Sequence, residues 1–359
     1  MAAFERIPEK EGRIVKVGLV GAGNIGKTHL SAYRKVRGAR VAAIAGRNRE
    51  AGEQLAEEYA CRHYPSLEAM LEQEEIDVVD ICLPTHLHEQ HAIQAARAGK
   101  HVLCEKPIAL TLGAAERMLE EVRQANVAFM VAQVLRFWPE YIAIKQWIDE
   151  GKLGRPEMVY ANRLSQPPDW SAWFRDAKKS GGALYDLHLH DIDYLIHLLG
   201  PVASVYAVGK QSENGAWDHV ATNLLFASGS KAVVEGSHLM GKDFPFTVTM
   251  RVNGPLGTLD YSNTSDRVSG KREGHLAWYG EGGRQPVDVK AGDPFVNQLQ
   301  YFVDCVKNGE RPQIITPEES VQVLRVMTAI QRSLETGEVQ RIDWMWRPGE
   351  MGKERECKE

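Results

Sequence analysis

The stretch that decides the fold runs from Val15 to Leu30 and reads VKVGLVGAGNIGKTHL. Its apolar first six residues predict a strand, and Gly21, Gly23 and Gly26 follow in the pattern G-x-G-x-x-G. The first glycine permits a tight turn and the second lets the backbone approach a pyrophosphate. The third lets the helix pack closely on the strand, with the phosphates at the helix N-terminus. Its position within a β-α-β unit favours a dinucleotide site over a glycine turn that binds nothing.

The composition excludes several classes of protein. The chain has 359 residues, 43% apolar and 25% charged, which is ordinary for a soluble protein of about two domains. A net charge of −5 with no basic run gives no electrostatic case for nucleic acid or an anionic membrane. We see no apolar run of about 18 residues and no signal peptide. The five scattered cysteines predict a reducing compartment, the cytoplasm.

The first third of the chain alternates strand and helix patterns. Near-continuous apolar strands separated by helices predict an α/β domain with a doubly wound parallel sheet, a Rossmann fold. We place this NAD(P)-binding domain at residues 14–135. The strands are expected at Val15–Val20, Arg40–Ala45, Val78–Leu83, His101–Cys104 and Val127–Val131. The helices are expected near Asn24–Lys35, Arg49–Tyr59, Leu87–Ala98 and Leu112–Gln124.

The pattern changes after about Arg136. Alternating apolar and polar residues separated by turns predict a second, α+β domain at residues 136–345 with an open, mostly antiparallel sheet. Its strands are expected near Glu157–Arg163, Ala203–Lys210, Val220–Phe226, Lys231–His238, Phe246–Val252 and Thr258–Tyr261. Its helices are expected near Pro139–Asp149, from Ala183 to Gly200, and over Pro294–Asn308 and Pro317–Glu335. A polar, aromatic-rich loop, Ser165–Gly182, precedes the second of these helices.

The end of the second strand bears on the choice of nucleotide. An acidic residue there would bind the adenosine ribose and favour NAD. This chain has Gly46 and then Arg47. A guanidinium group suits a 2′-phosphate, so we expect NADP in preference to NAD. The alternative is a solvated arginine at the start of a helix.

Glu105-Lys106-Pro107 follows a strand of the first domain. Ligands bind at the carboxyl edge of such a sheet. A lysine there could bind a substrate hydroxyl or ketone and stabilise developing charge. The alternative is a surface lysine, which the flanking proline and glutamate make less attractive.

A second titratable group lies beyond a double glycine. On a helix, Asp186 and His190 share a face because they are four residues apart. We expect the carboxylate to touch the imidazole and make His190 a general base. A structural histidine is the alternative, and His188 points the other way. Neither this group nor His86, His88 and His91 has a zinc-site spacing, so we expect no metal.

Together these motifs resemble the Gfo/Idh/MocA family, the glucose–fructose oxidoreductase and inositol dehydrogenase group. The resemblance covers roughly Lys16 to Ile342. It rests on GAGNIG, DVVDICLPTHLH, AGKHVLCEKPIALT, VAQVLRFWPEY, SGGALYDLHLHDIDYL and the segment F-x-x-x-x-x-N-G-x-x-P from Phe302. It implies a Rossmann domain and a C-terminal α/β domain whose open sheet often makes dimer or tetramer contacts. It also implies hydride transfer between nicotinamide and a sugar, inositol or related polyol or ketone.

The resemblance also implies roles for single residues. Lys106 matches the catalytic lysine, and Asp186 and His190 match the D-x-x-x-H pair. His190 would take the hydroxyl proton while Lys106 orients and polarises that oxygen. The residues expected at the cofactor are Gly21, Gly23, Asn24, Ile25, Gly26, Gly46, Arg47, Pro84, Thr85, His88, Glu105 and Lys106. The residues expected at the substrate are Gln133, Arg136, Trp138, Trp173, Asp176 and His190. Trp138 and Tyr141 are equally open to a packing role at the domain junction.

Two other functions stay open at this point. Trp170, Trp173 and Phe174 allow aromatic stacking, which suits an aromatic dihydrodiol or keto compound as well as the apolar face of a sugar. A non-catalytic nucleotide-sensing protein could be built on the same fold, although the lysine and the His–Asp pair are present. The partners expected are a small-molecule substrate and further copies of the chain, as a homodimer or homotetramer.

Overall fold

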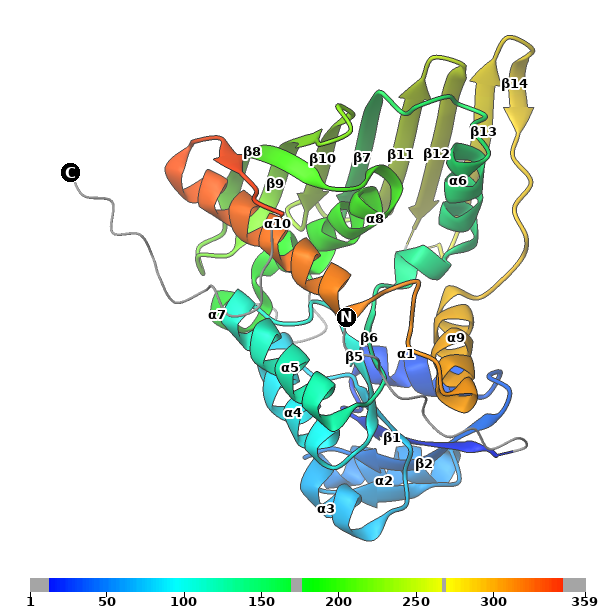
Figure 1. The fold of residues 1–359 in the computed structure, drawn as a ribbon, viewed down its shortest axis with the longest axis vertical. Helices are drawn as coiled ribbons and strands as arrows, with labels where there is room; N and C mark the ends of the chain where they lie inside the picture. Colours follow the sequence, from blue (N-terminus) through cyan, green and yellow to red (C-terminus); the bar gives the residue numbers. More distant parts are fainter. Residues whose placement is uncertain (1–12, 169–175, 267–268, 345–359) are drawn as a thin grey trace, which may run out of the picture.

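A six-stranded parallel sheet forms the first domain of the computed structural model, which describes residues 13–168, 176–266 and 269–344 (Figure 1). The strand order is β3-β2-β1-β4-β5-β6. The strands are β1 (Val15–Val20), β2 (Ala39–Ala45), β3 (Arg62–Tyr64), β4 (Val78–Ile81), β5 (His101–Glu105) and β6 (Phe129–Ala132). The helices between them are α1 (Asn24–Tyr33), α2 (Arg49–Glu58), α3 (Leu67–Gln73), α4 (His88–Arg97) and α5 (Leu112–Ala125). The predicted Rossmann fold is confirmed.

Two elements of this domain were not predicted, β3 and α3. Strand β3 has three residues and pairs only with β2 at the edge of the sheet. It is too short for its apolar pattern to be seen. Helix α3 has seven residues and begins at Ser66, whose side chain accepts a hydrogen bond from the Ala69 N–H group. That cap signal stands alone, because so short a helix has little apolar periodicity.

A nine-stranded sheet forms the second domain, in the order β14-β13-β12-β11-β7-β10-β9-β8-β15. All neighbouring strands are antiparallel except β7 and β10. The strands are β7 (Met158–Leu164), β8 (Val202–Gln211), β9 (Trp217–Phe226), β10 (Lys231–Ser237), β11 (Phe246–Gly254), β12 (Gly257–Ser265), β13 (Arg272–Gly280), β14 (Gly283–Pro286) and β15 (Gln340–Arg341). The expected open, mostly antiparallel sheet is confirmed. The outermost strands β13, β14 and β15 were missed because they are polar or short.

Three helices lie across one face of this sheet: α6 (Pro139–Asp149), α8 (Leu189–Leu199) and α10 (Pro317–Thr336) (Figure 1). The burial of β8 alternates accordingly, with Val205 and Ala207 buried and Tyr206 and Val208 exposed. On the opposite face, the side chains of Tyr206, Val208 and Leu225 are exposed. Before α8 the chain forms a short helix, α7 (Ala177–Ser180), and a π-helical turn, η4 (Leu184–His188).

Helix α9 (Pro294–Asn308) follows the second sheet in sequence but packs on the first domain (Figure 1). Its residues Leu299, Phe302 and Val303 are buried in one apolar cluster with β1 and α1. The Asn297 side chain donates a hydrogen bond of 3.2 Å to the Phe137 carbonyl, in the 3₁₀ turn η2 (Val134–Phe137). The two domains are therefore interlocked in sequence.

The described residues contain no helix that is long and apolar enough to cross a membrane. The cysteines at positions 61, 82, 104 and 305 are free thiols. Cys357 lies outside the described residues.

Candidate functional site

The glycine loop after β1 has room for a ligand on one side only. A Cβ atom on Gly26 would lie 2.0 Å from the Gly21 carbonyl oxygen, so this position needs glycine. Gly21 has φ +103°, a conformation that glycine adopts readily. A Cβ atom on Gly23 would meet nothing within 4 Å. The space beside Gly23 is where the backbone can approach a pyrophosphate.

The first turn of α1 suits an anion. Its residues Asn24 and Ile25 follow Gly23 at the N-cap, where no side chain caps the helix and no acidic residue lies in the first turn. Helix α2 differs, because the Asn48 side chain accepts from the Ala51 N–H and Glu50 lies in the first turn. Backbone N–H groups and the helix dipole of α1 are therefore free to hold phosphate, which fits a dinucleotide cofactor.

Arg47 lies just beyond the carboxyl end of β2. Its side chain is exposed and makes no ion pair with any residue in the described ranges. A Cβ atom on Gly46 would have no neighbour within 4 Å. Burial lowers the pKa of His86, in the 3₁₀ turn η1 (Thr85–Leu87), and the cations Lys179 and Arg47 lower it further. The Asp176 carboxylate, which pairs with Lys179, partly opposes these cations.

Lys106 follows β5 and reaches across to the second domain. Its Nζ atom donates to the Asp186 carboxylate oxygen Oδ1 at 2.7 Å and to the Asp186 carbonyl at 2.9 Å. The two side chains remain 15% and 17% exposed, so a ligand can reach them. Two residues that are 80 apart in sequence are thus joined where the two domains meet.

Lys106 is connected through Glu105 and His29 to the buried Asp80. The Glu105 carboxylate accepts from the Lys106 N–H at 3.1 Å and contacts His29 Nε2 at 3.1 Å. His29 Nδ1 lies 2.8 Å from the Asp80 carboxylate. Burial lowers the pKa of His29, but Asp80 and Cys82 together raise it by more, so the pKa lies well above its ordinary value. His29, Asp80 and Cys82 form the one group of possible metal ligands among the described residues, and their contacts with one another already account for their burial.

The expected contact between Asp186 and His190 does not form. The second Asp186 oxygen instead accepts from His238 Nε2 at 3.1 Å, which was not predicted. Burial raises the pKa of Asp186, but Lys106 and His238 together lower it by more. The pKa therefore lies well below its ordinary value. The carboxylate therefore has two donors already. Sequence reasoning placed His238 at the end of a strand but had no means of knowing which helix that end would meet.

His190 lies beside this pair with an unengaged imidazole. Its buried Nδ1 atom has no hydrogen-bond partner, and its side chain makes no hydrogen bond within the described ranges. Burial lowers the pKa of His190 well below its ordinary value, and the cations Lys106 and Arg163 add to this effect. A neutral imidazole next to a cationic lysine can accept a proton from a hydroxyl group. His188 is a structural residue, since its Nε2 atom lies 2.8 Å from the Thr222 hydroxyl.

Several other predicted residues lie around this point with different contacts. Gln133 follows β6 beside Lys106, because Ala132 pairs with Glu105, and its buried Oε1 atom has no partner. Pro84 precedes η1, and Thr85 is buried at its start. His88 was expected at the cofactor, but both its ring nitrogens lie 2.8 Å from carbonyl oxygens, those of Leu83 and Pro107. It is buried and ties two loops together instead.

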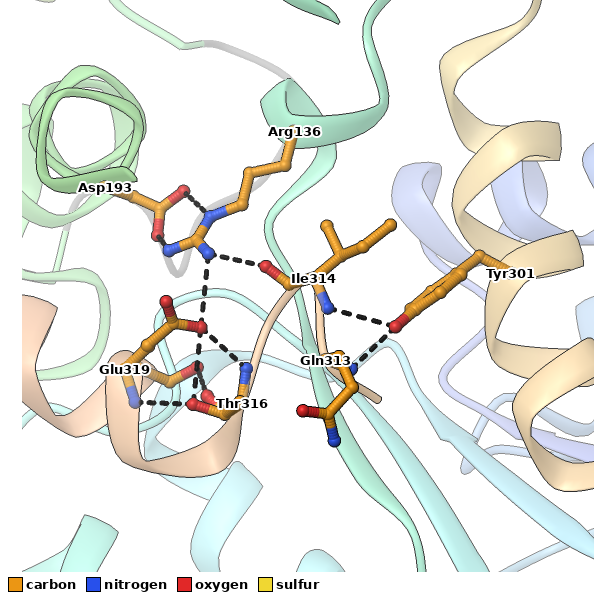
Figure 2. A network of polar contacts seen from close by, with 8 residues as sticks. Arg136, Asp193, Tyr301, Gln313, Ile314, Thr316 and Glu319 are labelled. Atoms are coloured by element: carbon orange, nitrogen blue, oxygen red, sulfur yellow. Dashed lines mark hydrogen bonds and ion pairs between the residues drawn. The ribbon is translucent and has the colours of Figure 1, made fainter. Parts of the chain in front are cut away.

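Arg136 was predicted to approach the substrate, but in the structure its side chain binds groups of the protein. Its guanidinium is fully buried and binds the Asp193 carboxylate through Nε at 3.1 Å and Nη2 at 2.7 Å (Figure 2). Its Nη1 atom donates to the Ile314 carbonyl at 2.6 Å and to Glu319 at 3.3 Å. Arg136 therefore joins α8 to the start of α10, and four of its five N–H groups bind groups of the protein.

The aromatic predictions have mixed outcomes. Trp138 is half-buried against the large apolar core, and Tyr141 is fully buried beside Tyr194 and Tyr261, which is a packing role. Asp176 caps α7 through the Lys178 N–H group and pairs with Lys179 at 2.6 Å. Trp173 lies outside the described residues, as do Trp170 and Phe174.

Comparison with known proteins agrees with this geometry. Residues 15–133 match the oxidoreductase family with an NAD-binding Rossmann fold, and residues 141–260 match the GFO/IDH/MocA C-terminal domain. The chain belongs to the Gfo/Idh/MocA family. The predicted family is confirmed, and with it an NAD-binding oxidoreductase.

Family members with different substrates resemble the chain. It is 34% identical to an inositol 2-dehydrogenase of Rhizobium meliloti over 69% of this chain and 76% of that protein. It is 29% identical to a D-xylose 1-dehydrogenase (NADP(+)) of Haloferax volcanii over 91% of this chain and 99% of that one. A levoglucosan dehydrogenase in complex with NADH and levoglucosan aligns with a TM-score of 0.79 and 25% identity, over 91% of this chain and 99% of that one.

Proposed function

We propose that this chain transfers a hydride between a nicotinamide nucleotide and a hydroxyl-bearing carbon of a sugar or cyclitol. The observation that carries the proposal is the meeting of Lys106 and Asp186 across the domain junction, with the unpaired imidazole of His190 beside them. Relatives that act on inositol, xylose and levoglucosan support the substrate class.

The chain's own residues divide the work of this reaction. The glycine loop and the first turn of α1 would hold the pyrophosphate. When bound, the nicotinamide nucleotide supplies the hydride acceptor. Lys106 donates a hydrogen bond to the reacting oxygen, which stabilises the charge that develops there. His190 takes the hydroxyl proton on its ring nitrogen, and in the reverse direction it returns that proton.

Turnover tests this proposal directly. Initial rates are measured with NAD and with NADP against inositols, aldoses and amino sugars. We expect turnover of a subset of these polyols, and its loss in His190→Ala. Nucleotide binding without turnover of any polyol or corresponding ketone would contradict the proposal and favour a sensing role.

Variants of Gly23 and Gly26 distinguish an effect on nucleotide binding from an effect on the stability of the fold. We expect Gly23→Ala to fold like the wild type, because its Cβ has free space, and to lose nucleotide binding. Gly26→Ala should also unfold at lower temperature, because its Cβ would collide with the Gly21 carbonyl. Nucleotide fluorescence titration and thermal melting distinguish the two. Unchanged nucleotide affinity in Gly23→Ala would show that the loop does not hold the pyrophosphate.

We propose that NADP is preferred over NAD. Arg47 is exposed and unpaired among the described residues, and its charge helps to lower the pKa of His86. Loss of a charged hydrogen bond to a 2′-phosphate should lower the NADP to NAD ratio of kcat/KM about 10- to 100-fold in Arg47→Ala. The matched control is Arg49→Ala, since Arg49 is exposed on α2 and paired with Glu53. A wild-type ratio of one or less would refute the preference, and equal ratios in all three proteins would refute the role of Arg47.

We also propose a homodimer or homotetramer assembled through the open face of the nine-stranded sheet. Large apolar side chains on that face are exposed, among them Val208 at 52% and Leu225 at 41%. Covering such residues is favourable. Light scattering should give two or four times the chain mass, and Val208→Lys with Leu225→Lys should lower it. A wild-type monomer would refute this arrangement.

A further inference from the structure

The Asp186 carboxylate is held from two opposite domains. One oxygen binds Lys106 of the first domain at 2.7 Å, and the other binds His238 at the end of β10 at 3.1 Å. Two donors on the two oxygens fix the rotation of a carboxylate, whereas one donor leaves it free to turn. The orientation of Asp186 toward Lys106 therefore depends on a residue that does not itself touch Lys106.

The imidazole of His238 has little else to bind. Its side chain is 4% exposed, and its buried Nδ1 atom has no partner. The nearby Asp218 holds the His238 backbone N–H through its carbonyl, and its carboxylate is occupied by the Ala183 N–H and the Ser212 hydroxyl. On the next strand, His219 pairs with Glu235. Asp186 is the charged group that His238 binds.

We infer that His238 is a positioning residue for the hydride-transfer reaction, an inference that rests on the function proposed above. It holds Asp186 on Lys106, and it thereby keeps the carboxylate away from His190. If released, Asp186 is free to turn toward His190 four residues along the chain. A carboxylate bound to that imidazole would change its basicity and occupy it. The aspartate–histidine pair of this site is then Asp186 with His238, and His190 acts alone.

Two substitutions at one position separate hydrogen bonding from packing. His238→Gln places an amide N–H where Nε2 lies, and His238→Leu keeps similar bulk without a donor. His219→Leu is the matched control, because His219 also binds a carboxylate from the adjacent strand, but that carboxylate is Glu235 and not Asp186. Wild type and variants are compared by kcat, KM, pH profile and thermal midpoint with the substrate that the panel identifies.

We expect His238→Leu to lower kcat about 100-fold, as misplaced catalytic groups do, while KM stays near the wild-type value. His238→Gln should recover most of kcat with a pH profile parallel to that of the wild type, and His219→Leu should match the wild type. Equal kcat for the Leu and Gln variants would overturn the inference. A Gln variant that loses one limb of the pH profile would also overturn it, because His238 would then transfer protons itself.

A measurement without turnover keeps the inference separate from the proposed function. Thermal midpoints are compared for His238→Leu, Asp186→Asn and the double variant. If the two side chains hold each other, the loss in the double variant is smaller than the sum of the single losses. Additive losses would overturn the inference even if the enzyme is active, and a wild type without turnover would overturn only the proposed function.

Discussion

One helix carries two aspartate–cation pairs that look alike and behave in opposite ways. Asp186 in η4 binds Lys106 after β5, and Asp193 in α8, seven residues on, binds Arg136 after β6. The first pair is 15% and 17% exposed, and the second is 0% and 2% exposed. At Asp193 burial raises the pKa by more than Arg136 lowers it. At Asp186 Lys106 and His238 together lower the pKa by more than burial raises it. Access decides which pair can meet a substrate and which one fastens the helix.

The largest effect that separates the pairs is expected in Lys106→Met. Removing the donor to the reacting oxygen should lower kcat by about 10²- to 10³-fold. Stability should change by only about 1–2 kcal/mol, since Asp186 keeps its bond to His238. Initial rates and urea unfolding measure the two effects. A kcat near the wild-type value would contradict the assignment of the Lys106–Asp186 pair to the reaction.

Arg136→Met should act on stability instead. It leaves the Asp193 carboxylate buried without its partner, which costs about 3–5 kcal/mol of the free energy of unfolding. Urea unfolding measures this loss. The double variant Arg136→Met with Asp193→Leu removes both charges and should recover much of it. A double variant as unstable as the single one would show that the guanidinium contributes mainly through Ile314 and Glu319.

The pH dependence of stability should have opposite signs at the two aspartates. The folded pKa of Asp186 is lowered, so its contribution is present above the unfolded value of about 3.9 and is lost as pH falls. The folded pKa of Asp193 is raised, so its ionisation weakens the fold as pH rises above about 3.9. Asp186→Asn should reduce the loss of stability in acid, and Asp193→Asn should reduce the loss as pH rises. Urea unfolding from pH 3 to 7 checks both slopes, and like changes in the two variants would contradict this assignment.

The smallest effect is expected at the far end of the Arg136 network. Thr316 and Glu319 form a capping box at the start of α10, and Glu319 also accepts from Arg136 (Figure 2). Thr316→Ala should cost about 1 kcal/mol of stability, as other lost caps do, with kcat unchanged. Thermal melting and initial rates measure this. A marked fall in kcat would mean that this network also acts on the site.

The first domain was largely predictable from the sequence because its signals are local. A strand, a glycine loop and the start of a helix lie within 16 residues. Position 26 must be glycine because a Cβ atom there would collide with the Gly21 carbonyl oxygen. The position of Lys106 at the carboxyl edge of the parallel sheet was predictable because it directly follows the apolar strand β5. The family resemblance then supplied the second domain's part in the site.

The contacts of the site were less predictable because they join distant segments. The spacing of Asp186 and His190 indicated a shared helix face, but it could not show that His238, 52 residues on, would compete for the carboxylate. The sequence equally could not show that Arg136 would be sealed by Asp193 and Ile314. A charged residue next to a site can face the ligand or the core, and only the packing of the second domain decides.

The return of α9 to the first domain also has a consequence for how the chain is made. Leu299, Phe302 and Val303 complete the apolar cluster around β1 and α1. During synthesis these residues leave the ribosome only after nearly the whole second sheet. One side of the first domain's core therefore stays uncovered until the last fifth of the chain has been made. A fragment that stops at the end of β6 would leave that side of the first domain's core exposed to water.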